Sequence, residues 1–143
     1  MKIYLAGPLF TTAERVFNTA LAELLRDFGY DVFLPQETEQ RDTTSRQIFE
    51  SDVAGIDWSD VVVANMDGVD PDSGTCWECG YAYGKKPVIL FRTDIREEGP
   101  PFGPFNLMMH QAAGGWLDCK GLSIAEIAAL IDEKLRGLVT SKS

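Results

Sequence analysis

Two carboxylates near the middle of the chain are the residues best suited to chemistry. Asp72 and Glu78 lie six positions apart, separated by a Ser-Gly-Thr-Cys-Trp segment. If a loop and the first helical turn carry them, both can face one pocket. A nucleophilic carboxylate beside a hydrogen-bonding one is the equipment of glycosyl transfer through a covalent sugar ester. The simpler interpretation is a solvated Glu78 and an Asp72 that only caps the helix.

The same segment offers free backbone N–H groups around Gly74 and Thr75, where a helix is expected to begin and a phosphate could bind. It lacks the Walker spacing and the Rossmann glycines. The neighbouring Asp67, Asp70 and Asp72 would also repel a phosphate. The local pattern therefore favours a neutral ligand over a phosphate.

Cysteine and histidine side chains offer a second kind of chemistry. Cys76 and Cys79 have redox or zinc spacing, but the chain contains only Cys119 and His110 as further ligands of that type. We favour two small residues on a packed helix and a structural His110. We expect no metal and no organic cofactor, because a nucleophile and an acid complete a glycosyl transfer by themselves.

Composition and charge narrow the classes of partner. The chain has 143 residues, 45% of them hydrophobic, and a net charge of −9. Such a surface repels polyanions, so a DNA or RNA polymer is not an expected partner, whereas a small nucleoside is compatible with it. The first ten residues lack the features of a signal peptide and no apolar run reaches membrane-spanning length, which predicts a cytoplasmic protein that does not bind membranes.

Short apolar runs alternate with longer amphipathic stretches, the pattern of strands joined by crossover helices. Strands are expected at residues 2–6, 31–34, 61–65, 87–91 and 115–117. Helices are expected at residues 12–28, from Thr43 or Thr44 to about Ser59, and at residues 74–84, 105–110 and 123–138. Thr11 or Thr12 is expected to cap the first helix, and Ser123 with Glu126 to form a capping box on the last. These elements predict one α/β domain over residues 1–143, a doubly wound (flavodoxin-like or Rossmann-like) five-stranded parallel sheet with helices on both faces.

Parallel sheets of this kind bind ligands at the carboxyl ends of their strands. Residues 7–10, 66–75 and 92–105 follow the first, third and fourth expected strands, so we expect the site there. The substrate-binding candidates on these loops or next to them are Gly7, Pro8, Phe10, Ser73, Gly74 and Met108.

Residues 93–104 are too rich in proline, glycine and charge to form a packed element. Long loops in compact domains often close over binding sites. We therefore expect a lid or, equally, a subunit interface, built with the apolar side chains Phe102, Phe105, Leu107 and Met108.

Three blocks of sequence resemble the nucleoside 2-deoxyribosyltransferase family. They are Ile-Tyr-Leu-Ala-Gly-Pro at residues 3–8, Asp-Ser-Gly-Thr-Cys-Trp-Glu-Cys-Gly-Tyr-Ala at residues 72–82, and Pro-Phe-Asn-Leu-Met at residues 104–108. Each block alone is modest evidence, but the three stand in the family's order. Together with the matching alternation of strands and helices, the resemblance covers most of the chain.

The resemblance implies a role for five residues. Glu78 matches the nucleophile that attacks C1′ of a 2′-deoxynucleoside, and Tyr4 matches the tyrosine that positions it. Asp72 matches an aspartate that binds the 5′-hydroxyl, and Asp52 one near the departing base. Asn106 matches an asparagine that completes the pocket of a neighbouring subunit, so a homo-oligomer, either a dimer or a trimer of dimers, is implied. Free nucleobases would be the second substrates.

Elementary chemistry agrees with these roles. An ionised Glu78 stabilises an oxocarbenium-like transition state, and a protonated Asp52 would help the base to leave. Two alternatives stay open. Related enzymes hydrolyse 2′-deoxynucleoside 5′-monophosphates, with a serine in place of Asp72 and an arginine in the first loop, where this chain has none before Arg15. A non-catalytic nucleotide-binding protein on the same fold is the alternative of another class.

Overall fold

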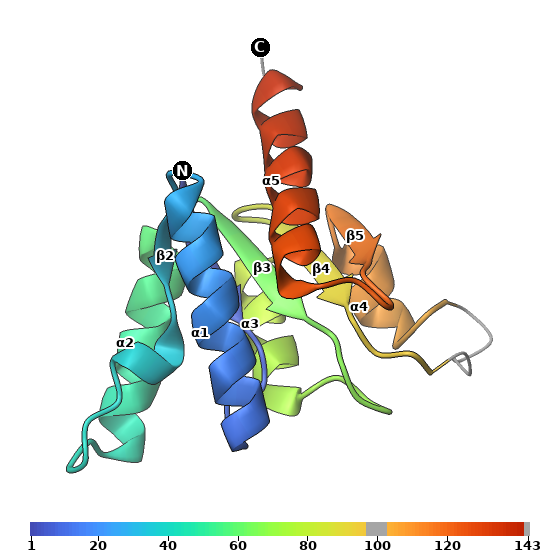
Figure 1. Cartoon of the computed structure of the whole chain (residues 1–143). Coiled ribbons are helices and arrows are strands. Elements are labelled where there is room, and N and C mark those ends of the chain that lie inside the picture. Colours follow the sequence, from blue (N-terminus) through green and yellow to red (C-terminus); the bar gives the residue numbers. More distant parts are fainter. Residues whose placement is uncertain (97–102, 142–143) are drawn as a thin grey trace.

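The computed structural model describes residues 1–96 and 103–141, which contain one parallel sheet in the order β2-β1-β3-β4-β5 (Figure 1). The strands are β1 (Lys2–Ala6), β2 (Asp31–Phe33), β3 (Val61–Asn65), β4 (Val88–Arg92) and β5 (Gly115–Asp118). The helices are α1 (Thr12–Asp27), the 3₁₀ helix η1 (Pro35–Glu37), α2 (Ser45–Trp58), α3 (Ser73–Ala82), α4 (Leu107–Ala112) and α5 (Ile124–Thr140). The predicted fold class is confirmed. From β1 the chain first adds β2 on one side and then β3, β4 and β5 on the other, so the point where the order switches lies between β1 and β3.

Successive side chains of each strand point to opposite faces of the sheet, which creates two separate cores. In β3, Val61 and Val63 pack in the core with α1 and α5, whereas Val62 and Ala64 pack in the core with α2 and α3. Figure 1 shows α1 and α5 together on the near side of the sheet. Tyr4 of β1 belongs to the second core, so β1 directs this side chain towards α2 and α3.

Side chains at the helix starts account for where the helices begin. Thr11, Thr44 and Ser123 each accept a hydrogen bond from a backbone N–H three residues later and form capping boxes. Asp72 caps α3 and Asn106 caps α4. Among the described residues, no helix is both long enough and apolar enough to cross a membrane.

Apart from shifts of one or two residues at several boundaries, the structure differs from the expected elements at η1 and at the short helix before β5. η1 follows β2 directly and was not predicted, because its signal is a single Pro35 at the first helical position. The short helix begins at Leu107 rather than at Phe105, because Asn106 serves as its cap. Phe105 is instead buried in the core against Trp116, and Phe102, expected beside it in a lid or a subunit interface, lies outside the described residues.

Candidate active site

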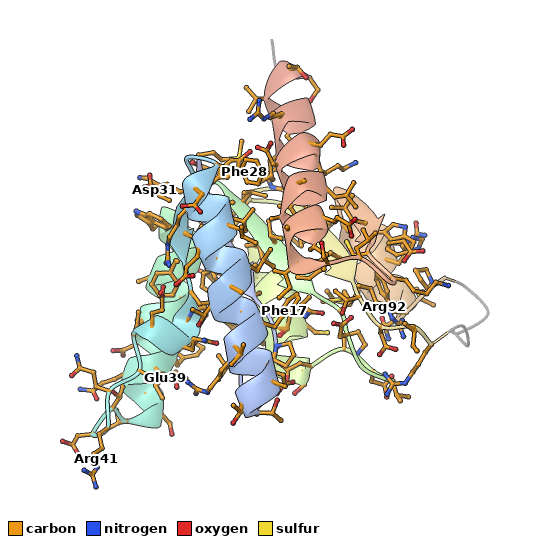
Figure 2. All side chains as sticks on the ribbon, viewed as in Figure 1. Phe17, Phe28, Asp31, Glu39, Arg41 and Arg92 are labelled. Atoms are coloured by element: carbon orange, nitrogen blue, oxygen red, sulfur yellow. The ribbon has the colours of Figure 1, made fainter. Side chains whose placement is uncertain are left out.

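A cavity of about 540 Å³ opens where the chain leaves β1. Its walls come from the segments after β1 and β2 and from α2 and α3, through Gly7, Leu9, Phe10, Pro35, Glu39, Ile48, Phe49, Asp52, Val53, Asp72, Gly74, Trp77 and Glu78. The described part of residues 92–105, which the sequence places at the site, does not line this cavity. Figure 2 shows Arg92, at the end of β4, well apart from Glu39.

Tyr4 and Glu78 meet at the floor of this region. The Tyr4 side chain is fully buried, and its hydroxyl donates a hydrogen bond to Oε2 of Glu78. The Tyr4 ring stacks on Phe33 of β2, with ring centroids 5.4 Å apart and planes 12° from parallel. The strand and the stacked ring therefore hold the hydroxyl at one position, and the hydroxyl fixes one oxygen of the Glu78 carboxylate.

The environment of Glu78 keeps its proton affinity high. Burial raises the pKa of Glu78 to about 7, the hydrogen bond from Tyr4 opposes that rise, and the charges of Asp52 and Asp72 add to it. Burial and the neighbouring Glu78 raise the pKa of Tyr4 far above its ordinary value, so Tyr4 remains a hydrogen-bond donor. Glu78 is thus poised to change charge near neutral pH, as functional carboxylates often are.

Asp52 lies on α2, in the wall of the same cavity. Burial, followed by the charge of Glu39, raises the pKa of Asp52 to about 6. Its Oδ1 atom is buried and has no hydrogen-bond partner among the described residues. A buried carboxyl oxygen without a hydrogen-bond partner costs free energy of folding. A ligand that forms a hydrogen bond with this carboxyl group would remove that cost, as expected for a group that gives its proton to a ligand.

Asp72 has a structural task as well as a place in the cavity wall. Its Oδ2 atom accepts hydrogen bonds from the backbone N and the Oγ1 of Thr75, each at 2.9 Å. The side chain of Thr75 is buried, so this cap is shielded from water. The capping interpretation and a binding role are therefore compatible at this residue, because the cap uses only Oδ2.

The remaining predicted binding residues fall into two groups. Gly7, Phe10 and Gly74 line the cavity, whereas Pro8, Ser73, Asn106 and Met108 are not part of its described lining. Pro8 faces α1, where its carbonyl accepts a hydrogen bond from Asn18. The side chain of Asn106 accepts from the backbone N of Met108, which is 71% exposed. Asn106 thus lies outside the described lining of the cavity of its own chain.

An apolar wall and an ion pair were not predicted as parts of the site. Ile48, Phe49 and Val53 form the apolar face of α2, but they line the cavity rather than filling the core. The Phe49 ring lies 5.4 Å from that of Trp77. Glu39 also lines the cavity and pairs with Arg15 at 2.9 Å. Of these features, only the apolar face of α2 could be predicted, from the helical spacing of its residues. That spacing does not tell whether the face packs in the core or lines a cavity.

The cysteines and the histidine lie outside this chemistry. Burial raises the pKa of the Cys76 and Cys79 thiols, which disfavours a reactive thiolate. His110 packs edge-on against Phe105 and Trp116. The described residues contain no cluster of three side chains suited to holding a metal ion.

A family model described as nucleoside 2-deoxyribosyltransferase matches residues 3–116, which include all four segments of the cavity wall. The chain belongs to this family. Its sequence is 34% identical over 94 residues to the uncharacterized protein UU063 of Ureaplasma parvum. That match covers 57% of this chain and 58% of the Ureaplasma protein, so it spans less than two thirds of that relative's length.

Solved structures extend the similarity over nearly the whole chain. A conserved protein from Enterococcus faecalis V583 has 29% identity and a TM-score of 0.74, with 94% of this family member and 98% of that chain covered. A 2-deoxyribosyltransferase from Bacillus psychrosaccharolyticus has 28% identity and a TM-score of 0.69, with 90% of each chain covered. A CMP N-glycosidase from Clostridium botulinum shares the fold, with 18% identity and a TM-score of 0.66. The match covers 92% of this chain and 98% of the glycosidase chain.

Proposed function

We propose that this protein transfers the 2-deoxyribosyl group between nucleobases of 2′-deoxynucleosides, through a covalent ester on Glu78. The observation that carries the proposal is the meeting of Tyr4, Glu78 and Asp52 at one cavity, with Glu78 hydrogen-bonded by Tyr4 and Asp52 presenting a buried oxygen without a partner among the described residues. Family membership supports the same reaction. The substrates are small deoxynucleosides and free bases.

The reaction starts from the state in which Glu78 is ionised and Asp52 carries a proton. Because the pKa of Asp52 is about 6 and that of Glu78 about 7, this state lies within about 1–2 kcal/mol of the one with the proton on Glu78. An oxygen of ionised Glu78 bonds to C1′ of the sugar while the C1′–N bond to the base breaks. The bonding electrons go to the base nitrogen, and the proton of Asp52 neutralises the charge that develops there. A second base then takes the sugar from Glu78 by the reverse steps, and water in its place yields hydrolysis.

The charge of the cavity argues against 5′-monophosphates as substrates. Asp72 and Glu39 both line it, and a carboxylate repels a phosphate dianion but accepts a hydrogen bond from a neutral 5′-hydroxyl. Arg15, the first arginine of the chain, pairs with Glu39. Asp72 is accordingly proposed to bind the sugar hydroxyl.

The decisive experiment separates products by chromatography. Wild type and Glu78→Ala are incubated with deoxyinosine or thymidine, each with and without a second free base, and with a deoxynucleoside 5′-monophosphate alone. We expect a new deoxynucleoside from wild type only. Free base without exchange would replace transfer by hydrolysis, and the absence of any product would favour a non-catalytic nucleotide-binding protein.

A further inference from the structure

One carboxylate of the cavity wall, Glu39, belongs to an ion pair that takes no part in the proposed reaction. Glu39 follows η1 and pairs with Arg15 of α1, whose guanidinium nitrogen lies 2.9 Å from Oε2 of Glu39. The Glu39 side chain is only 26% exposed and lines the same cavity as Asp52. Because the cavity wall is partly shielded from water, the negative charge of Glu39 is screened less there than on an open surface and acts more strongly on Asp52.

A polar network holds the segment that carries Glu39. Asn18, buried on α1, donates 3.0 Å hydrogen bonds to the carbonyl of Pro8 and to Oε1 of Gln36. Gln36 in turn donates to the carbonyl of Arg15 at 2.9 Å. The segments after β1 and β2 are thus tied to the same turns of α1, so Glu39 is held in the wall by both its own ion pair and its neighbours in the chain.

Resting on the proposed function, we propose that Glu39, held by Arg15, is a positioning residue that keeps the proton on Asp52 until the base departs. The charged and titratable groups that interact with Asp52 come from three directions: Glu39 after η1, Glu78 on α3 and Tyr4 on β1. Tyr4 is neutral and Glu78 is ionised in the reactive state. Glu39 is therefore the negative group near Asp52 that the chemistry does not consume.

The two members of the pair act on Asp52 in opposite directions. The Glu39 carboxylate raises the pKa of Asp52. The guanidinium of Arg15, held against that carboxylate, carries the opposite charge, so we expect it to offset part of the effect. Glu39→Gln should therefore lower the pKa of Asp52, and Arg15→Gln should raise it. Arg15→Lys keeps the positive charge and serves as the matched control.

The test titrates Asp52 directly in the resting protein, by NMR of ¹³C-labelled aspartate carboxyls with Asp52→Asn for assignment. The pH profile of kcat/KM is measured for the same variants. For Glu39→Gln we expect the Asp52 titration to move to lower pH and kcat/KM at the optimum to fall about threefold to tenfold. Arg15→Gln should move the titration to higher pH, and Arg15→Lys should leave it in place.

Two outcomes would overturn the inference. An Asp52 titration that stays in place in Glu39→Gln removes the electrostatic link, and an equal loss of kcat/KM at every pH reduces Glu39 to a structural role. Failure of the proposed function has a different signature, because a wild type without transfer activity still allows the carboxyl titration. Thermal unfolding of each variant identifies any that fails to fold.

Discussion

At the scale of single residues, the hydroxyl of Tyr4 is the contact with the most direct effect on Glu78. Its hydrogen bond lowers the pKa of Glu78 against the effect of burial. Tyr4→Phe should therefore leave less Glu78 ionised at neutral pH and reduce kcat about tenfold to hundredfold, the effect of losing one hydrogen bond to a charged group. The ring stacking on Phe33 is kept. Steady-state kinetics with unchanged thermal unfolding checks this, and an undiminished kcat would contradict it.

Glu78 itself should make stability depend on pH. Its pKa is about 7 in the folded protein, above the ordinary 4.5, so the stability contributed by its bound proton is complete below about pH 4.5 and is lost as pH rises through 7. Glu78→Gln stays neutral at every pH. We expect this variant to be more stable than wild type by about 1–3 kcal/mol at pH 8 and equally stable near pH 4. Urea unfolding of both proteins at both pH values measures the difference in their free energies of unfolding. The same difference at pH 4 and pH 8 would contradict the prediction.

At the scale of elements, close packing of α2 on β2 supports the site. A Cβ added to Gly55 would lie 2.7 Å from the ring of Phe33, the residue on which Tyr4 stacks. Gly55→Ala should destabilise the fold by about 1–3 kcal/mol and lower activity by displacing Tyr4. Gly137→Ala on α5 meets no atom within 4 Å, and it should stabilise the protein by up to about 1 kcal/mol. Thermal unfolding of the two variants tests this, and equal shifts would contradict it.

The start of α3 separates the two roles of Asp72. Its Oδ2 caps the helix through Thr75. Asp72→Asn should preserve most of the cap but weaken sugar binding, which raises KM, whereas Asp72→Ala should in addition cost about 1 kcal/mol of stability. Chemical unfolding and KM measured side by side would reveal a purely structural Asp72 if KM stayed unchanged in the Asn variant.

At the scale of the whole molecule, the homo-oligomer that the family resemblance implies would allow complementation between subunits. Asn106 caps α4 and is not part of the described lining of its own chain's cavity. If it completes a neighbour's pocket, Glu78→Ala and Asn106→Ser chains should each be inactive alone and regain part of the activity when refolded together, because mixed assemblies contain intact sites. The serine of the Asn106→Ser variant can still cap α4. Mixtures as inactive as their components would place Asn106 outside the neighbouring site.

The order of the strands and α-helices, the fold class and several helix caps were predictable from the sequence because they depend on local patterns, whereas η1 and the cap at Asn106 were not predicted. The apolar run 61–65 reads as a buried strand, and Thr11, Thr44 and Ser123 are capping residues within one turn of their partners. The three motif blocks likewise identified the family, which the match over residues 3–116 confirmed.

Only the tertiary structure decided which side of the sheet carries the cavity and what its far wall contains. The Arg15–Glu39 pair joins α1 to the segment after η1, and no periodicity links the two residues. The raised pKa of Asp52 depends on its burial and on Glu39, thirteen residues earlier in the chain. Residue types can be read from a sequence, but burial and distances between charges arise when separate elements pack, and they set the protonation of the site.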